Sequence, residues 1–333
     1  MNSIAFSSSD IALRRCLATI LNPGALALIQ DRGRFGYQHL GIGASGVADS
    51  HGAGWANRLL GNSSGDAVIE LCLGNFRMQF KSEGRFAIAG ADLGWRLDGE
   101  RLENWCSYRA RAGAKLEASI ATDGLRGYLG FSGGVDAPLI CGSRATSQGD
   151  GLGGLKGNGE PLAKGDVLTF GCPMNSGIHD ASVRAVPSQF RRTYGTAVTL
   201  RVVPSNQFNA FSADCVHQLL NTSYTVAPDS DRMGVRLAGS ALPEPPGNLI
   251  SEPVSPGAIQ VPANGQPIVL MQDCQTIGGY PKLGHVYRVD LDRLAQARPG
   301  AQVRFVMGNR AESQHEWLLQ SQFFSSAVVG ANA

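Results

Sequence analysis

A polar segment that follows a hydrophobic run is the first candidate for chemistry. Residues 272–282 read Gln-Asp-Cys-Gln-Thr-Ile-Gly-Gly-Tyr-Pro-Lys and bring amide, hydroxyl, carboxylate and amine groups around two glycines. The preceding run, residues 267–271, is short, apolar and bounded by turn residues, which predicts a buried strand. A polar loop at the end of a buried strand predicts a binding site. An ordinary tight turn is the alternative, because the two glycines allow positive φ and Pro281 fixes the exit of the chain.

A second polar cluster repeats this arrangement near the N-terminus. Residues 30–39 read Gln-Asp-Arg-Gly-Arg-Phe-Gly-Tyr-Gln-His and follow the apolar residues 25–29. Two strand ends with similar polar residues favour a functional interpretation over two unrelated turns. Arg144, in a Gly-Ser-Arg-Ala-Thr segment, is either a surface charge or a side chain that binds an anion.

Three further charged residues need an explanation. Asp231 and Arg232 stand in a Pro-Asp-Ser-Asp-Arg-Met-Gly segment, which either forms a simple turn or presents an acceptor and a bidentate donor to a small polar ligand. Glu70 lies inside a predicted buried strand, where a carboxylate must be paired. Arg34 and Arg58 are the partners that we expect for it.

The sequence contains no convincing motif for a bound cofactor or metal. Residues 41–46 fit the dinucleotide pattern G-x-G-x-x-G, but residues 37–40 before them do not form the hydrophobic strand that this motif requires. No phosphate loop of the G-x-x-x-x-G-K-[ST] type is present. The six histidines never stand at H-x-H or H-E-x-x-H spacing. We therefore expect this chain to bind no metal and no cofactor by itself.

Composition limits the class of protein and its partners. The 333 residues fit two domains of ordinary size. A charged fraction of 17% and a formal net charge of +2 give no strong field for nucleic acid or an anionic membrane. The seven cysteines are scattered without a Cys-x-x-Cys pair, so we expect reduced thiols rather than disulfides or zinc. Residues 1–20 hold no apolar stretch long enough for a signal peptide or a membrane span, and we expect a cytoplasmic protein.

The elements that must position these residues are mostly strands. Short apolar segments recur along the chain, and 43 glycines predict many turns. Predicted strands are 25–29, 67–73, 76–80, 85–89, 127–131, 166–170, 198–203, 258–261, 267–271, 285–289 and 302–307. Predicted helices are 50–60, which Asp49 caps and Gly61 stops, 210–220 and 291–297. The expected fold is mainly β with a few short helices.

A series of motifs runs in order from residue 22 to residue 307. In the first part these are NPG at 22–24, QDRGRFGYQHLG at 30–41, SGVAD at 45–49, ANRLLGN at 56–62, IEL at 69–71 and GSRAT at 142–146. In the second part they are PDSDRMG at 228–234, ISE at 250–252, PGAIQVP at 256–262, GQP at 265–267 and QTIGGYPK at 275–282. The series resembles the biotin-dependent carboxyltransferase family, which includes allophanate hydrolase subunit 2, the KipA proteins and the C subunit of bacterial 5-oxoprolinase.

The resemblance implies a domain organisation. Two cyclophilin-like β-barrel domains are expected at 22–175 and 196–308. Residues 1–21 are then expected to be a loosely ordered extension and residues 309–333 a C-terminal tail. The family also implies a partner of the allophanate hydrolase subunit 1 (KipI) type, which completes the active site.

The resemblance also implies a function that needs other subunits. We expect the C subunit of an ATP-dependent 5-oxoprolinase, which opens the lactam 5-oxo-L-proline to L-glutamate together with a KipI-type subunit and a third subunit. The alternatives are a carboxyltransferase component that moves a carboxyl group from carboxybiotin to urea or a related amide, and a KipA-type regulatory binding protein. This chain has no Met-Lys-Met biotinylation site and no nucleotide loop, so ATP, or biotin in the alternative, is expected to be used by the complex.

A lactam or urea-like substrate needs donors for its carbonyl and acceptors for its N–H, which assigns roles within these motifs. The predicted catalytic residues are Asp31 and Asp231 as general bases, and Lys282 as a donor. The predicted substrate-binding residues are Arg34, Asn57, Arg144, Arg232, Gln275, Thr276, Gly278, Gly279 and Tyr280. Among these, Arg34 and Arg232 are expected to donate to a carbonyl or carboxylate, while Asn57 and Gln275 orient the amide.

Overall fold

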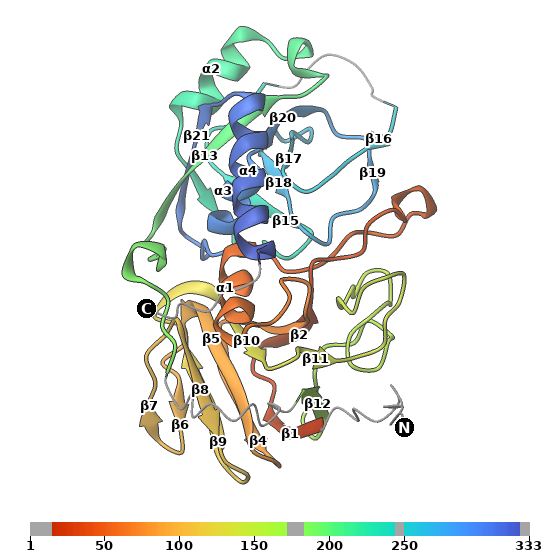
Figure 1. The fold of residues 1–333 in the computed structure, drawn as a ribbon. Coiled ribbons are helices and arrows are strands. Elements are labelled where there is room, and N and C mark those ends of the chain that lie inside the picture. Colours follow the sequence, from red (N-terminus) through yellow and green to blue (C-terminus); the bar gives the residue numbers. More distant parts are fainter. Residues whose placement is uncertain (1–14, 172–182, 244–249, 327–333) are drawn as a thin grey trace, which may run out of the picture.

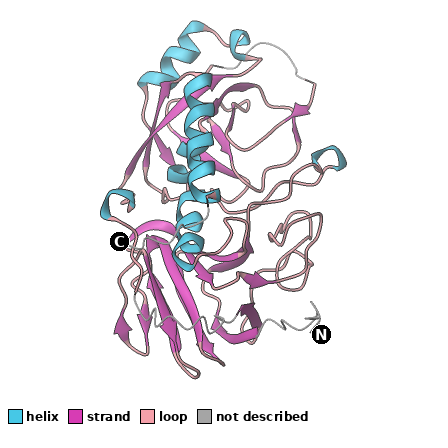
Figure 2. Cartoon of the chain, viewed as in Figure 1, coloured by secondary structure: helices cyan, strands magenta, loops and turns pink. Residues whose placement is uncertain are grey.

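The structure is a computed structural model that describes residues 15–171, 183–243 and 250–326. Strands dominate both halves of this part of the chain (Figure 2), which confirms the mainly β fold expected from the sequence. Two β units lie one above the other (Figure 1). Helices α1 (Ser50–Leu60) and α4 (Arg310–Ser325) contact each other where the units meet.

The first unit consists of two antiparallel sheets. The larger one has the strand order β11 (Val135–Asp136), β12 (Val167–Gly171), β1 (Arg15–Asn22), β4 (Gly74–Phe80), β9 (Lys115–Ile120), β6 (Arg96–Leu97) and β7 (Glu100–Arg101). The smaller one has the order β2 (Leu26–Gln30), β3 (Val68–Cys72), β10 (Asp123–Phe131), β5 (Gly84–Asp92) and β8 (Cys106–Ala110). Here the expected barrel is therefore present as two separate sheets.

One hydrophobic core fills the space between these two sheets. Alternation along β4 places Phe76, Met78 and Phe80 in the core, where Phe86 and Ile88 of β5 meet them. The residues between them on β4 are more exposed, as expected for a sheet with one face in water. β5 and β10 are buried on both faces, because α1 covers the side that faces away from this core.

The second unit is the closed barrel that the sequence led us to expect. Its strands follow the order β13 (Ala197–Pro204), β20 (Lys282–Val286), β17 (Ala258–Gln260), β18 (Ile268–Leu270), β15 (Gly234–Ala238), β14 (Tyr224–Val226) and β21 (Gln302–Met307). A separate ribbon is formed by β16 (Glu252–Pro253) and β19 (Ile277–Gly278). Helices α2 (Ala213–Asn221) and α3 (Arg288–Leu294) contact the barrel strands β21 and β13. Short 3-10 turns are η1 (Gln38–Leu40), η2 (Ser188–Phe190) and η3 (Phe208–Ala210).

Helix α1 has the ends that its sequence predicts. The Asp49 carboxylate accepts hydrogen bonds from the backbone N–H groups of His51 and Gly52, and Gly61 ends the helix at a φ of 72°. Gly52 also allows close packing, because a Cβ at this position would lie 2.8 Å from the ring of Tyr128. The helix therefore rests directly on β10, and this contact brings Asp49 to the junction between the two units.

Both ends of the described chain carry more structure than the sequence led us to expect. Residues 15–21, expected to be part of a loose extension, belong to β1, which pairs with β12 and β4. Within the expected tail, Asn309 caps helix α4 by accepting a hydrogen bond from the Glu312 N–H. The predicted strand 285–289 ends early, since β20 stops at Val286 and α3 begins at Arg288.

Two further expectations concern the cysteines and the membrane. Cys16 is disulfide-bonded, so the expectation of reduced thiols throughout is wrong at this residue. Cys72, Cys106, Cys141, Cys215 and Cys274 are free. Among the described helices, none combines the length and the apolar character that a membrane crossing needs.

We expect protonation of His51 to destabilise the fold at acid pH. Burial lowers the pKa of this imidazole to about 3, and the charge of Arg192 adds to the lowering. Below its unfolded value of about 6.5, the unfolded chain binds a proton that the folded chain does not, so stability falls as the pH falls through this window. Urea unfolding at pH 7 and pH 5 should show a smaller pH dependence for His51→Gln than for the wild type. The same change at the exposed His217 is the control, and an unchanged slope in His51→Gln would contradict the expectation.

Candidate functional site

Three polar segments that are far apart in the sequence meet at the junction of the two units. The Ser45 hydroxyl donates to the Asp273 carboxylate at 2.6 Å, and the Ser45 N–H donates to the Gln272 carbonyl. The Asp273 N–H in turn donates to the carbonyl of Arg232 at 2.8 Å. The loop after β2, the segment 228–234 and the segment after β18 are thus joined by direct hydrogen bonds.

Arg232 is the central cation of this junction. Its side chain is 6% exposed and makes a bidentate ion pair with Asp273, with Nε–Oδ2 and Nη2–Oδ1 distances of 2.7 and 2.8 Å. It also donates to the Glu70 carboxylate and to the Gly46 carbonyl. Burial by itself lowers the pKa of the Arg232 guanidinium, but the charges of Asp273 and Glu70 outweigh burial and raise it. Because its donors are engaged within the protein, Arg232 holds the junction together and does not lie free for a substrate.

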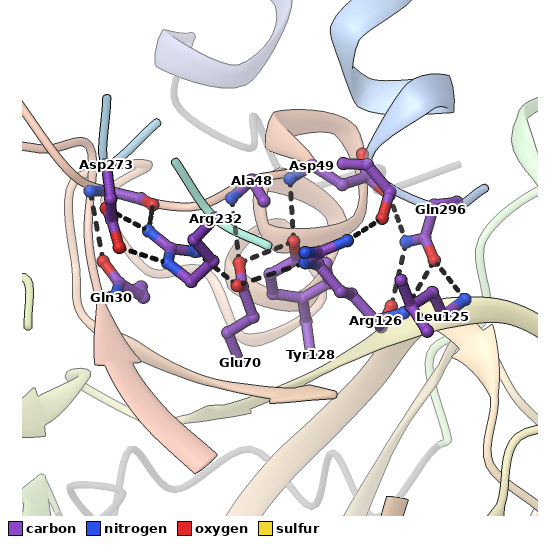
Figure 3. A network of polar contacts seen from close by, with 12 residues as sticks. Gln30, Ala48, Asp49, Glu70, Leu125, Arg126, Tyr128, Arg232, Asp273 and Gln296 are labelled. Atoms are coloured by element: carbon purple, nitrogen blue, oxygen red, sulfur yellow. Dashed lines mark hydrogen bonds and ion pairs between the residues drawn. The ribbon is translucent and has the colours of Figure 1, made fainter. Parts of the chain in front are cut away.

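Glu70 has a different partner from those expected. Its carboxylate pairs with Arg232 and accepts hydrogen bonds from the Ala48 N–H and the Tyr128 hydroxyl, both at 2.8 Å (Figure 3). Arg34 is far from this role, because it donates to the carbonyls of Ile140 and Ala145. Arg58 donates to the carbonyls of Phe323 and Ser326 at the end of α4. The expected pairing of Glu70 with Arg34 or Arg58 is therefore wrong.

The network continues from Tyr128 to the C-terminal unit. The Tyr128 hydroxyl accepts a hydrogen bond from the Asp49 N–H at 2.7 Å, and the Asp49 carboxylate accepts one from the Gln296 amide at 2.7 Å (Figure 3). The Gln296 amide oxygen accepts from the N–H groups of Leu125 and Arg126. Residues of the first unit and of the barrel thus satisfy one another at this buried surface, as buried polar groups require.

Asp31 organises the loops beside this junction. Its two carboxylate oxygens accept hydrogen bonds from the Gly33 N–H, the Ser143 hydroxyl at 2.6 Å and the Arg144 N–H at 2.7 Å. Arg34 binds the carbonyls of the same 140–145 loop. Asp31 and Arg34 therefore fix one loop against another. Their predicted catalytic and substrate roles stay predictions.

A cleft at the barrel contains three of the predicted site residues. It has a volume of about 460 Å³, and Asp231, Gln275 and Tyr280 line it together with Gln260. Asp231 uses one oxygen to accept hydrogen bonds from the N–H groups of Met233 and Gly234. The amide groups and the carboxylate offer hydrogen bonds to a ligand that carries both a carbonyl and an N–H.

Gln260 is the residue of this cleft that sequence reasoning missed. It belongs to β17, its side chain is buried, and its amide nitrogen has no hydrogen-bond partner among the described residues. A buried amide without a partner costs free energy, so this nitrogen is a donor that a ligand in the cleft can satisfy. Gly278 leaves room for this group, because a Cβ there would lie 2.6 Å from the Gln260 nitrogen. The signal in the sequence was a glutamine between isoleucine and valine in a predicted strand.

The other predicted residues lie around the cleft rather than among its lining. The Lys282 ammonium is buried against the Glu252 carboxylate at 2.9 Å and the Pro253 carbonyl at 3.1 Å, so it anchors β16. Thr276 accepts a backbone hydrogen bond from Val254, and Gly278 pairs with Glu252 in the ribbon of β16 and β19. Gly279 follows β19 directly.

Asn57 and Arg144 complete the predicted set, and neither lines the barrel cleft. The Asn57 amide donates to the Asp66 carbonyl from α1. The Arg144 side chain is partly buried, and its Nε has no hydrogen-bond partner in the described part of the chain. No group of three or more possible metal ligands occurs within residues 15–171, 183–243 and 250–326.

Comparison with known proteins identifies the family that shares this architecture. Residues 40–307 match the family described as carboxyltransferase domain, subdomain A and B. The chain belongs to this carboxyltransferase family. The resemblance inferred from the motifs is thereby confirmed, since the match includes the segments 228–234 and 272–282 and all strands of the barrel.

Relatives in the carboxyltransferase family are of two kinds. The chain is 32% identical to the 5-oxoprolinase C subunit of Escherichia coli K12, with 92% of this chain and 96% of that protein covered. It is 34% identical to the 5-oxoprolinase C subunit of Haemophilus influenzae, with 86% and 89% covered. The structure of the Kluyveromyces lactis urea carboxylase superposes with a TM-score of 0.83 at 26% identity, over 96% of this chain but only 30% of that one.

Proposed function

We propose that this chain is the C subunit of a cytoplasmic, ATP-dependent 5-oxoprolinase that converts 5-oxo-L-proline to L-glutamate. The observation that carries the proposal is its similarity over nearly the full length of two proteins that are named as C subunits of 5-oxoprolinase. The urea carboxylase, in contrast, is more than three times as long as the part that matches.

The barrel cleft is the substrate site in this proposal. The ring of 5-oxoproline has a carbonyl, which the Gln260 and Gln275 amides can bind, and an N–H, which the Asp231 carboxylate can accept. Charge that develops on the carbonyl oxygen as the ring opens needs hydrogen-bond donors in place before the reaction. Buried Gln260 is the best placed donor, because its nitrogen has no partner within the described protein.

The proposal also requires other subunits. Of the three predicted catalytic residues, only Asp231 lines the barrel cleft, whereas Asp31 and Lys282 are engaged in contacts within the protein. We therefore propose that the active site at the cleft is completed by a KipI-type subunit, and that a third subunit joins the complex. The described residues offer no site that we assign to ATP, so its use is attributed to the assembled complex.

A carboxyltransferase component is the second candidate function. It is favoured by the superposition with the urea carboxylase, because the same fold serves in a larger protein with that name. In this case a biotinylated partner would deliver the carboxyl group, and the same cleft would bind urea or a related amide.

The test is reconstitution of the complex. This chain is co-expressed with candidate KipI-type and third subunits, and 5-oxoproline-dependent ATP hydrolysis and glutamate release are measured with and without it. Loss of both activities on omission is the expected result. An assembled complex without either activity would contradict the proposal, and urea-dependent carboxyl transfer with a biotinylated partner would then support the second candidate. Binding to a KipI-type partner without any turnover would indicate a KipA-type regulatory protein.

Asp231→Asn tests the carboxylate of the cleft. Asparagine keeps the oxygen that accepts from Met233 and Gly234, so the turn stays intact while the negative charge is lost. We expect the turnover of 5-oxoproline by the complex to fall at least about tenfold, as for loss of a general base. Asp214→Asn is the matched control, because this exposed carboxylate lies on α2 and does not line the barrel cleft. Wild-type turnover in Asp231→Asn would remove Asp231 from the catalytic set.

A further inference from the structure

A second cavity lies at the junction, apart from the barrel cleft. It has a volume of about 280 Å³ and is bordered by α1, α4, the loops that flank α1 and the first residue of α3. Most of its wall area is apolar, with Val47 and Val68 from the first unit and Trp317 and Phe324 from α4. The lining also includes the carboxylates of Asp31 and Asp66, which accept hydrogen bonds from loop residues. It shares no lining residue with the barrel cleft.

Arg288 is one of two cations that line this junction cavity, and the other, Arg32, donates to the hydroxyls of Ser64 and Ser325. The Arg288 Nη1 donates to the Gln272 amide oxygen at 3.1 Å, and its guanidinium lies 5.4 Å from the centre of the Trp317 ring. Among the described residues Arg288 has no carboxylate within ion-pair distance. Burial lowers the pKa of Arg288, and the charge of Asp292 opposes this lowering without cancelling it.

The positive charges of two other arginines at the junction are neutralised by carboxylates. Arg232 pairs with two carboxylates, and Arg201 pairs with Asp290 and Glu316. Asp292, one helical turn beyond Arg288 on α3, is already bound by the Ser50 hydroxyl and the Gln320 amide. Arg288 therefore keeps a guanidinium whose remaining donors can bind an anion.

We propose that the junction cavity binds a small organic carboxylate. The carboxylate would pair with the Arg288 guanidinium, a planar donor group that matches it in geometry. The apolar body of the ligand would lie against Trp317 and Phe324. The cavity is close to the lower end of the usual range for small-molecule sites, which restricts the ligand to about the size of one ring.

Small carboxylate ligands of this kind come from two sources. The substrate and product of the proposed reaction, 5-oxo-L-proline and L-glutamate, are small carboxylates, and so is an unrelated regulatory metabolite. The inference does not depend on the proposed reaction, because it concerns a cavity outside the barrel cleft and can be tested by binding alone.

Isothermal titration calorimetry on the full chain, without partner subunits, tests the inference. The probes are 5-oxo-L-proline, L-glutamate and benzoate, with 2-pyrrolidinone as the lactam that lacks a carboxylate. 2-Pyrrolidinone has only the groups that the barrel cleft is proposed to bind, so any signal from it should be the same in the wild type and in Arg288→Gln. We expect saturable binding of at least one carboxylate at the junction cavity. Arg288→Gln should weaken this binding at least about tenfold, because the charge-assisted pair is lost. Arg293→Gln, on an exposed position of the same helix, should leave it unchanged.

A second variant, which blocks the cavity sterically, keeps the inference testable if Arg288→Gln misfolds. Ser321→Leu places a larger side chain from α4 into the cavity, and no hydrogen bond of the Ser321 side chain is lost within the described structure. It should abolish binding while the chain stays folded. Binding of 5-oxoproline but not of benzoate would identify the ligand as a reactant, and the reverse would identify a regulatory carboxylate. The inference is overturned if no carboxylate binds the folded wild type, or if both variants bind within twofold of it.

Discussion

Replacement of Arg232 by methionine is expected to lower the free energy of unfolding by about 3–5 kcal/mol, the cost of breaking a buried ion pair. The change leaves the Asp273 carboxylate buried without a cation and leaves Glu70 with only the more distant Arg126, at 3.7 Å. Chemical denaturation of the purified chain measures the loss. The control is Arg236→Met, since the ion pair of Arg236 with Asp229 is exposed and such pairs contribute at most about 1 kcal/mol.

A compound variant sharpens this prediction. When Arg232, Glu70, Asp273 and Arg126, which also pairs with Glu70, are all replaced by apolar residues of similar size, much of the stability should return, because no member of the network keeps an unpaired buried charge. A loss below about 1 kcal/mol in Arg232→Met would mean that water reaches the two carboxylates, and the buried network would then be ruled out as a source of stability.

The second large effect is expected at Gln260. Gln260→Leu removes the amide donor from the barrel cleft, and we expect 5-oxoproline turnover by the complex to fall about 100-fold, as when one donor of an oxyanion site is lost. The stability of the chain should stay equal or rise, since the buried amide nitrogen has no partner to lose within the described structure.

Measuring turnover and stability together distinguishes a substrate-binding role of Gln260 from a structural role. A purely structural glutamine would lower both stability and activity when it is replaced. Gln314→Leu, at an exposed position of α4, is the control and should change neither. Turnover within twofold of the wild type in Gln260→Leu would exclude this residue from the substrate site.

Local signals in the sequence predicted the elements whose ends are fixed by neighbouring residues. Helix α1 was predicted from Ser50 to Leu60, because Asp49 and Gly61 act within one turn of the helix that they limit. Helix α4 was missed, since its apolar residues do not gather on one face and Asn309 was its main signal. The pairing of β1 with β12 was missed because the two strands are joined only by the folding of some 150 intervening residues.

The candidate site was predictable only in part for the same reason. Burial of Glu70 required a cation, but nothing local indicates that this cation is Arg232, which is 162 positions away. The polar segments were predicted as candidate site segments, and they do meet at the junction. Asp31 and Lys282 make hydrogen bonds and ion pairs that hold these segments together, and only the tertiary contacts reveal this.

The position of the network between the two halves restricts how such a chain can change. Glu70 belongs to the first half, whereas Arg232, the nearer of its two cations, is encoded by the second. The capping residue of α1, Asp49, likewise depends on Gln296 for one of its hydrogen bonds. A recombination event that joins halves from two ancestors would therefore give a stable protein only if these matching residues are inherited together. The two halves have separate cores, but the contacts between them require that they evolve as a pair.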